Sequence, residues 1–86
     1  MNPTAMVDRT PDDRLDLRGT PCPINFVRTK LRLQSMQPGA LLEVWLDPGE
    51  PIEQVPDSLT MEGYEIEQIE DCSEFFQLMV RRPITV

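Results

Sequence analysis

The sequence predicts an α+β fold: a two-layer α/β sandwich with the element order β-α-β-α-β-β. Three observations lead to this fold class. The chain has 86 residues, which is enough for one domain with one core. Its first part alternates strand-like and helix-like apolar patterns, which favours parallel strands joined by helices. Its last part holds two strand-like segments around a short polar turn, so the predicted sheet is four-stranded and mixed, with both helices on one face.

A strand, a helix and a second strand are expected in the first half of the chain. Residues 14–18 alternate polar and apolar positions, as a strand with one buried face does. Pro23 suits a first helical position, and the helix is expected to run from there to about residue 34. Residues 40–46 are dense in apolar side chains, which predicts a central strand with Trp45 in the core.

The second half is expected to contain a short helix and a hairpin. The stretch at 50–63 is interrupted by prolines, so a helix is expected only from Pro56 onward, where proline fits the first turn. A third strand is expected at 64–70 and a fourth at 75–81, joined by a turn at 71–74.

The first predicted helix has two apolar stripes on nearly opposite faces. In a two-layer domain only one stripe can face the sheet, so the other is at least partly exposed, or is covered by loops or a partner. One stripe contains Phe26, Thr29, Leu33 and Met36, and the other contains Ile24, Val27 and Leu31.

Composition excludes several classes of chemistry. The chain has no histidine, which removes Ser-His-Asp and Cys-His catalysis and most zinc sites. Two cysteines are too few for a four-thiolate metal site, and no metal or other cofactor is expected. Residues 1–13 are polar and aperiodic, so a flexible tail is expected before a single domain at 14–86. With no apolar run typical of a membrane span or signal peptide, a cytoplasmic location is expected.

The net charge of −7 is unevenly distributed. Residues 43–74 hold eleven acidic side chains and no basic one, whereas residues 18–32 hold four basic side chains and no acidic one. The acidic segment is either a solvated face or a surface for basic partner proteins. Direct tight binding of nucleic acid is disfavoured, because neutralising phosphates needs a larger basic surface.

Cys22 is the main candidate for chemistry. It lies between two prolines at the expected N-cap of the first helix, where the helix dipole favours an anion such as a thiolate. Arg28 and Lys30 could add positive potential, and the prolines stiffen the backbone around the sulfur. The alternative is that Cys22 is a small buried residue at a strand–helix junction.

Residues 16–23 read Asp-Leu-Arg-Gly-Thr-Pro-Cys-Pro, and a Pro-Gly turn follows the helix. This pattern resembles the TusA/SirA-like sulfur carrier family over nearly the whole predicted domain. The resemblance implies that Cys22 accepts sulfane sulfur as a persulfide from a cysteine desulfurase or rhodanese-like donor. The sulfur would then pass to an acceptor protein, for tRNA thiolation, molybdenum cofactor synthesis or related sulfur trafficking.

One residue departs from the motif. The family has Cys-Pro-x-Pro, and the second proline is Asn25 here. Asn25 either restores a backbone N–H donor near the sulfur, which would stabilise a thiolate or persulfide, or marks a divergent paralogue. Pro23, Arg28 and Lys30 are the other expected supports of the sulfur site, while Ile24 and Val27 are expected to dock a partner.

Two further readings remain open at this stage. The chain could be a non-catalytic regulatory or protein-binding module on the same fold. A redox dithiol is disfavoured, because Cys22 and Cys72 lack Cys-x-x-Cys spacing and Cys72 lies among carboxylates that disfavour a thiolate. A monomer is the simplest expectation for a carrier that moves between partners.

Overall fold

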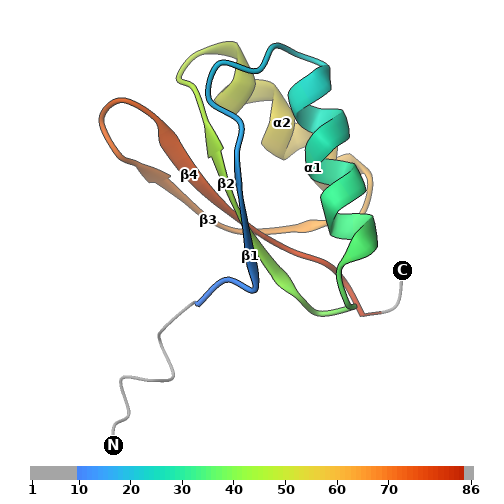
Figure 1. Ribbon diagram of the computed structural model, residues 1–86. Helices are drawn as coiled ribbons and strands as arrows, with labels where there is room; N and C mark the ends of the chain where they lie inside the picture. Colours follow the sequence, from blue (N-terminus) through green and yellow to red (C-terminus); the bar gives the residue numbers. More distant parts are fainter. Residues whose placement is uncertain (1–9, 85–86) are drawn as a thin grey trace, which may run out of the picture.

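The computed structural model describes residues 10–84, so residues 1–9 of the expected tail lie outside the described residues. The elements follow the predicted order, and Figure 1 labels them along the chain. They are β1 (Asp13–Asp16), α1 (Ile24–Ser35), β2 (Leu41–Leu46), α2 (Glu50–Met61), β3 (Glu65–Asp71) and β4 (Phe76–Arg81). The predicted α+β fold class is confirmed.

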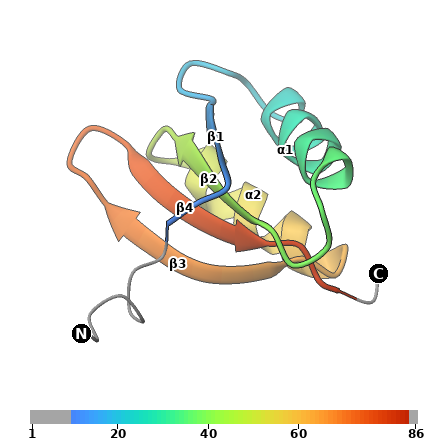
Figure 2. The same ribbon diagram turned by 60° about the horizontal axis from the view of Figure 1, so that its bottom comes forward.

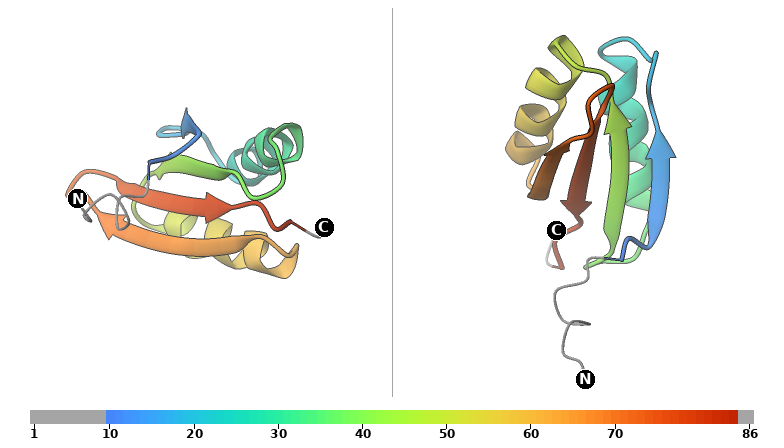
Figure 3. Two further views of the ribbon diagram at one scale, coloured as in Figure 1. Left: turned by 90° about the horizontal axis from the view of Figure 1, so that it is seen from below. Right: turned by 90° about the vertical axis from the view of Figure 1, so that its left-hand side faces the viewer.

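The four strands lie in the order β1-β2-β4-β3. β1 and β2 run parallel, whereas β4 is antiparallel to both of its neighbours. β3 therefore runs in the same direction as β2, and α1 and α2 each connect parallel strands that step the same way across the sheet. Right-handed crossovers of this kind place their helices on one face. The right-hand panel of Figure 3 shows the sheet in front and both helices behind it.

Strand register brings three connections to one edge of the sheet. Trp45 pairs with Asp16, Leu46 pairs with Phe76, and Phe76 pairs with Asp71. The loop after β1, the loop after β2 and the β3–β4 turn consequently leave the sheet at the same end, the upper end in Figure 1. In Figure 2 the β3–β4 hairpin extends beyond the helices at this end.

The core fills the space between the helices and the sheet. α1 contributes Thr29 and Leu33, both fully buried, while Phe26 and Met36 pack against the same cluster. Of the two predicted stripes, the one with Phe26, Thr29, Leu33 and Met36 therefore faces the sheet. The buried residues of this core cluster are Leu15, Leu17, Leu33, Leu42, Val44, Leu46, Val55, Leu59, Tyr64, Leu78 and Val80.

The second helix is longer than predicted. α2 begins at Glu50, so the expectation of a short helix starting at Pro56 is wrong. Pro51 lies in the first turn, where a missing N–H costs nothing, and Pro56 lies inside the helix, where one bond is lost. Burial of Val55 and Leu59 against the core offsets that lost hydrogen bond.

The start of β1 also falls earlier than expected, inside the stretch 1–13. The N–H of Asp12 donates to the carbonyl of Leu41 at 2.8 Å, and its carboxylate accepts the Leu41 N–H at 2.8 Å. No helix in the described part of the chain is long and apolar enough to cross a membrane. Across residues 10–84, no three His, Cys, Asp or Glu side chains come together as a metal site would require.

Candidate functional site at the β1–α1 junction

Cys22 lies in the loop between β1 and α1, one residue before the N-cap of the helix. The N-cap is Pro23, whose carbonyl accepts the Val27 N–H at 3.0 Å, and the helix begins at Ile24. The prediction that Cys22 itself is the N-cap is therefore wrong by one residue, because the Pro23 carbonyl already makes the first helical bond. The thiol is half-buried, and the Cys22–Pro23 peptide bond is cis.

Asn25 holds the sulfur through its side-chain amide. Its Nδ2 donates to Sγ of Cys22 at 3.2 Å, and the residue is fully buried. The amide orientation is fixed by the backbone N–H of Phe26, which donates to Oδ1 of Asn25 at 2.6 Å. A backbone N–H can only donate, so Oδ1 must face Phe26 and Nδ2 must face the sulfur.

The backbone N–H groups of Asn25 and Phe26 are occupied elsewhere. The N–H of Asn25 donates to the carbonyl of Pro21 at 3.0 Å, and that of Phe26 is taken by the Asn25 side chain. The sequence predicted that the backbone N–H of Asn25, which the motif proline lacks, would lie near the sulfur. The structure instead gives the sulfur a single donor from a side chain that replaces the second proline of the motif.

A small hollow of about 70 Å³ opens between the first turn of α1 and the middle of α2. Cys22 is one of its lining residues. The hollow is larger than the roughly 10–15 Å³ that one water molecule requires, so it leaves room for one more atom beside the thiol. Its lining consists of Cys22, Pro23, Phe26, Gln54, Val55 and Ser58.

The two basic residues expected to support the sulfur do not line this hollow. Lys30 lies further along α1, and its Nζ pairs with Oε1 of Glu62 at 3.1 Å. Arg28 is exposed and lines a different hollow, between α1 and β1, together with Leu15 and Leu31. At 1.5 Å of rise per residue, Arg28 and Lys30 lie about 6 and 9 Å beyond Ile24 along the helix axis.

The outer stripe of α1 is exposed beside the cysteine. Ile24 is 51% exposed, Val27 is 45% exposed and Leu31 is 59% exposed. Isolated exposed apolar residues are common, but three in one helical row form a continuous apolar strip. This confirms that only one stripe of the helix faces the sheet, and the exposed strip begins two residues after the thiol.

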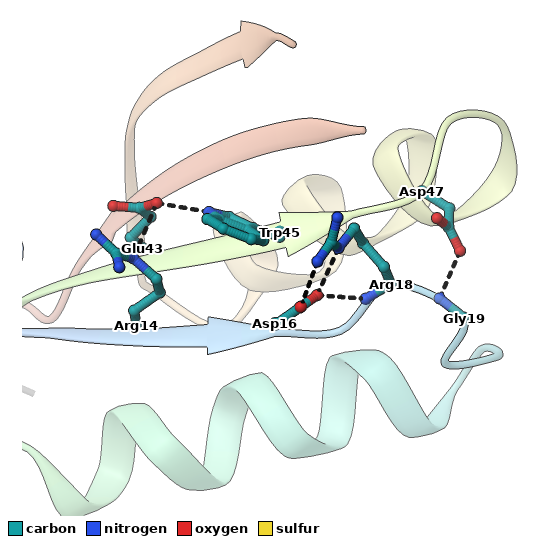
Figure 4. A network of polar contacts seen from close by, with 7 residues as sticks. All are labelled: Arg14, Asp16, Arg18, Gly19, Glu43, Trp45 and Asp47. Carbon is teal, nitrogen blue, oxygen red and sulfur yellow. Dashed lines mark hydrogen bonds and ion pairs between the residues drawn. The ribbon is translucent and has the colours of Figure 1, made fainter. Parts of the chain in front are cut away.

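The open face of the sheet carries a network that sequence reasoning missed, drawn in Figure 4. Asp16 accepts two hydrogen bonds from the Arg18 guanidinium, at 2.9 Å from Nε and 2.7 Å from Nη2. That guanidinium lies 4.8 Å from the ring centroid of Trp45 and 5.1 Å from that of Phe75. Trp45 is half-buried on this face and stacks on Phe75, so its predicted place in the core is wrong.

Period-two alternation explains the place of Trp45. Its neighbours Val44 and Leu46 face the helices, so Trp45 must face the other side of the sheet. Asp16 pairs with Trp45 across the strands and therefore shares that face. The short spacing between Asp16 and Arg18 was the available sequence signal for this ion pair.

The network anchors the loop that carries Cys22. The N–H of Gly19 donates to Oδ2 of Asp47 at 2.7 Å, which ties the loop to the connection after β2. Gly19 has φ of +80°, a left-handed conformation that favours glycine. Hydrogen bonds from the Arg18 side chain and backbone lower the pKa of Asp16 to about 2, so the carboxylate stays ionised in ordinary conditions.

Glu43 belongs to the same network on the open face of the sheet. It is buried, and burial by itself raises the pKa of its carboxyl group. Hydrogen bonds from Gln77 and Trp45 and the charge of Arg14 outweigh that penalty, so the pKa lies below its usual value. The Arg14 Nε lies 3.2 Å from Oε2 of Glu43, and the ionised Glu43 accepts the Trp45 indole N–H.

Cys72 lies in a different environment. It is half-buried in the turn between β3 and β4, and its thiol donates to the carbonyl of Glu70 at 3.8 Å. Its N–H donates to the carbonyl of Phe75 at 2.9 Å, which closes the turn. Asp71 and Glu74 flank it in the sequence. The Cys72 sulfur thus meets a hydrogen-bond acceptor, whereas the Cys22 sulfur meets a donor.

The junction offers one partly accessible thiol with a fixed N–H donor and an adjacent apolar strip. Such an arrangement suits thiol transfer chemistry in which a partner supplies the acid–base groups. A family model described as "Sulfurtransferase TusA" matches residues 13–82. The chain belongs to the TusA family.

Curated relatives of this TusA-family chain are candidate sulfur carrier proteins. One from Thermotoga maritima is 44% identical over 57 residues, covering 66% of this chain and 72% of the relative. One from Archaeoglobus fulgidus is 40% identical over 60 residues, covering 70% and 68%. The candidate sulfur carrier YedF of Escherichia coli is 29% identical over 77 residues, covering 90% of this chain and 100% of YedF.

A solved structure shares the fold of this TusA-family chain. It is the SirA-like protein from Desulfitobacterium hafniense, with a TM-score of 0.69 and 21% sequence identity. The match covers 83% of this chain and 97% of that protein. It supports the two-helix, four-stranded architecture and adds nothing on activity.

Proposed function

We propose that this TusA-family chain is a sulfur carrier that receives sulfane sulfur as a persulfide on Cys22 and hands it to an acceptor protein. One observation carries the proposal. Cys22 is a half-buried thiol at a junction packed into the core, with an N–H donor on its sulfur and a hollow beside it. A structural cysteine would need neither the donor nor the hollow.

The transfer balances without a cofactor in this chain. The Cys22 thiolate attacks the terminal sulfur of a donor persulfide, R–S–SH, where R is the donor protein. The new bond joins Sγ of Cys22 to that terminal sulfur, the donor S–S bond breaks, and the donor leaves as R–S⁻. The products are Cys22–S–SH and the donor thiolate, so no external oxidant or reductant is required. Delivery repeats the exchange with Cys22 as the leaving thiolate.

The neighbouring residues take separate parts in this proposal. Pro23 fixes the backbone between the thiol and α1, and Ile24 and Val27 dock the partner through the exposed apolar strip. Lys30 is held by Glu62 at 3.1 Å, so its contribution at the sulfur is weakened by distance and by that pairing. Arg28 is exposed near the same strip and contributes to recognition of an acidic rim on the partner.

The proposed partners follow from this chemistry. The donor is a protein that holds a persulfide, of the cysteine desulfurase or rhodanese-like class, and the acceptor is a protein with a nucleophilic thiol. The routes that fit are tRNA thiolation, molybdenum cofactor synthesis or related sulfur trafficking, carried out in the cytoplasm by a monomeric carrier. The carrier itself does not hold the nucleic acid.

An intact-mass experiment tests the proposal. The purified protein is incubated with a cysteine desulfurase, its pyridoxal phosphate cofactor and free cysteine. The expected result is a gain of the mass of one sulfur atom, which is lost in Cys22→Ser and kept in Cys72→Ser. The absence of any adduct with several donor enzymes of both classes would overturn the proposal and favour a regulatory module. Loss of the adduct in both variants would indicate a dithiol.

A further inference from the structure

We infer that Asn25 is a positioning residue that makes Cys22 a better leaving thiolate, so that the carrier is tuned for delivering sulfur more than for accepting it. This inference rests on the proposed function, because it concerns the second half of the transfer. It states which step of the sulfur transfer, loading or delivery, the hydrogen bond at the sulfur accelerates.

The hydrogen bond from Nδ2 of Asn25 to the Cys22 sulfur is not explained by the burial of Asn25 alone. A fully buried carboxamide must satisfy its own polar atoms, and Oδ1 does so with the Phe26 N–H at 2.6 Å. The other end, Nδ2, lies 3.2 Å from Sγ of Cys22. The amide cannot rotate its donor away without placing Nδ2 against the Phe26 N–H, which would leave two donors facing each other.

The backbone holds this donor in place from two further sides. The Asn25 N–H donates to the carbonyl of Pro21 at 3.0 Å, and the Asn25 carbonyl accepts the Thr29 hydroxyl at 2.9 Å. Thr29 is itself fully buried. The donor is therefore already oriented before any sulfur transfer begins, and it requires no rearrangement when charge develops on Sγ.

The preference for delivery over loading follows from how a hydrogen bond to sulfur affects thiol exchange. Donation to sulfur is stronger when the sulfur carries negative charge, so it stabilises the leaving thiolate. A better leaving thiol departs faster, whereas the same stabilisation lowers the nucleophilicity of each thiolate, with a Brønsted slope of about 0.4–0.5. During loading Cys22 attacks, and during delivery it leaves. The Asn25 bond therefore speeds delivery and, once the thiol is fully ionised, slightly slows attack.

Two chemical probes separate these steps without any partner protein. All variants carry Cys72→Ser, so that only Cys22 reacts. For delivery, the persulfide is loaded chemically and discharged by cyanide: Cys22–S–SH and CN⁻ give Cys22–S⁻, SCN⁻ and H⁺, and thiocyanate is measured. For attack, the free thiol reacts with an aromatic disulfide at about pH 10, where a cysteine is mainly ionised.

Asn25→Ala and Asn25→Asp are the decisive variants. In Asn25→Ala, discharge is expected to be about threefold to tenfold slower, while attack at high pH is unchanged or faster. Asn25→Asp keeps the shape and the acceptor for Phe26 but replaces the donor by a carboxylate, so its discharge should be slower still. A purely structural role predicts the reverse order, because aspartate preserves the packing and alanine does not.

A matched control removes the same kind of hydroxyl-to-carbonyl bond from the other helix and leaves Asn25 and its contacts intact. Thr60→Val removes the hydroxyl that donates to the Pro56 carbonyl at 2.9 Å on α2, and both rates are expected to stay within about twofold of the parent. Circular dichroism and thermal melting report whether each variant is folded, and the isosteric Asn25→Asp carries the test if Asn25→Ala does not fold.

The outcomes distinguish this inference from the proposed function. The inference would be overturned if folded Asn25 variants discharged at the rate of the parent. It would also be overturned if the discharge rate and the attack rate fell by the same factor, even if donor enzymes load Cys22. If the Asn25 variants show slower discharge with unchanged or faster attack, but no donor enzyme loads Cys22, the role of Asn25 stands and the carrier function fails.

Discussion

The β1–α1 junction and the β3–β4 turn lie at the same edge of the sheet and each carries one half-buried cysteine, yet they surround sulfur in opposite ways. Cys22 accepts a hydrogen bond from the amide of Asn25, whereas the thiol of Cys72 donates to the carbonyl of Glu70. A donor favours an anionic sulfur and an acceptor favours a neutral thiol. The difference teaches that the reactivity of a thiol depends on whether its neighbours donate hydrogen bonds to the sulfur or accept them from it. The number of cysteines in a sequence does not reveal this.

These two regions are also physically linked. Arg18, in the loop that leads to Cys22, stacks against Phe75, which closes the turn that holds Cys72. Arg18 also lies over the ring of Trp45, which stacks on Phe75, and Figure 4 shows Arg18 and Trp45 on the side of the sheet away from α1. The predictions below test how far the two regions differ and how strongly this link couples them.

Stability should depend strongly on the junction and weakly on the turn. Leu17, at the start of the junction, is 1% exposed and belongs to the core cluster. Leu17→Ala is therefore expected to lower the free energy of unfolding by about 2–5 kcal/mol, because it leaves a cavity. Cys72→Ala should change it by less than about 0.5 kcal/mol. Urea denaturation measures both, and similar losses would contradict the comparison.

Recognition of the donor should also separate the two regions. Ile24→Asp or Val27→Asp places a charge on the apolar strip beside Cys22, and loading from a donor enzyme is expected to slow by roughly tenfold, since apolar anchors dominate interfaces. Both side chains are about half exposed, so folding should be unaffected.

Ile69→Asp provides a matched control for this effect. Ile69 is 49% exposed, close to the value for Ile24, but it lies on β3. Its substitution should leave the loading rate within about twofold of the parent. An equal decrease in all three variants would mean that the strip on α1 is not the docking surface.

The fold was readable from the sequence because its signals are local. Period-two alternation marked the strands, and the two stripes of α1 were visible in the spacing of its apolar residues. The start of α2 was not, because prolines at 51 and 56 look like breaks until the packing of Val55 and Leu59 is known. Tertiary burial overrode a local propensity there.

The site was only partly readable. Cys22 stood out by its place between prolines at a helix start, and Asn25 stood out as a departure from a motif. The amide-to-sulfur bond was not predictable, because it depends on a one-residue shift of the N-cap and on the Phe26 N–H that orients the amide. The stacking of Arg18 on Trp45 joins residues on different elements, and no short-range pattern encodes it.

Direct alkylation should rank the two thiols. At pH 7, iodoacetamide is expected to modify Cys22 several-fold faster than Cys72, because the Cys22 sulfur accepts a hydrogen bond from Asn25 whereas the Cys72 thiol donates its proton to the Glu70 carbonyl. Peptide mass spectrometry gives both rates in one sample. Asn25→Ala, which removes the donor, should slow the modification of Cys22 and leave that of Cys72 unchanged. Equal rates in the unaltered protein would remove the contrast between the two sites.

The smallest expected effect concerns the link between the regions, and it has a defined pH window. The Arg18 hydrogen bonds lower the pKa of Asp16 from its ordinary 3.8 to about 2. Because the folded-state pKa lies below the unfolded one, the stabilisation is complete above about pH 4 and is lost as the pH falls through about 2. Asp16→Asn lacks this contribution throughout. Its melting temperature should therefore be slightly below that of the parent at pH 7, and the gap should close as the pH falls toward 2.

An exposed carboxylate on α2 supplies the comparison for this measurement. Asp57→Asn removes one negative charge without touching Arg18, so it reports the effect of net charge alone. Fluorescence of Trp45, the only tryptophan, follows the local contact, because Arg18 lies over its ring. A gap between Asp16→Asn and the parent that stays constant down to pH 2 would show that the Asp16–Arg18 pair does not titrate with the folded state. The stacking on Phe75 alone would then connect the loop of Cys22 to the turn of Cys72.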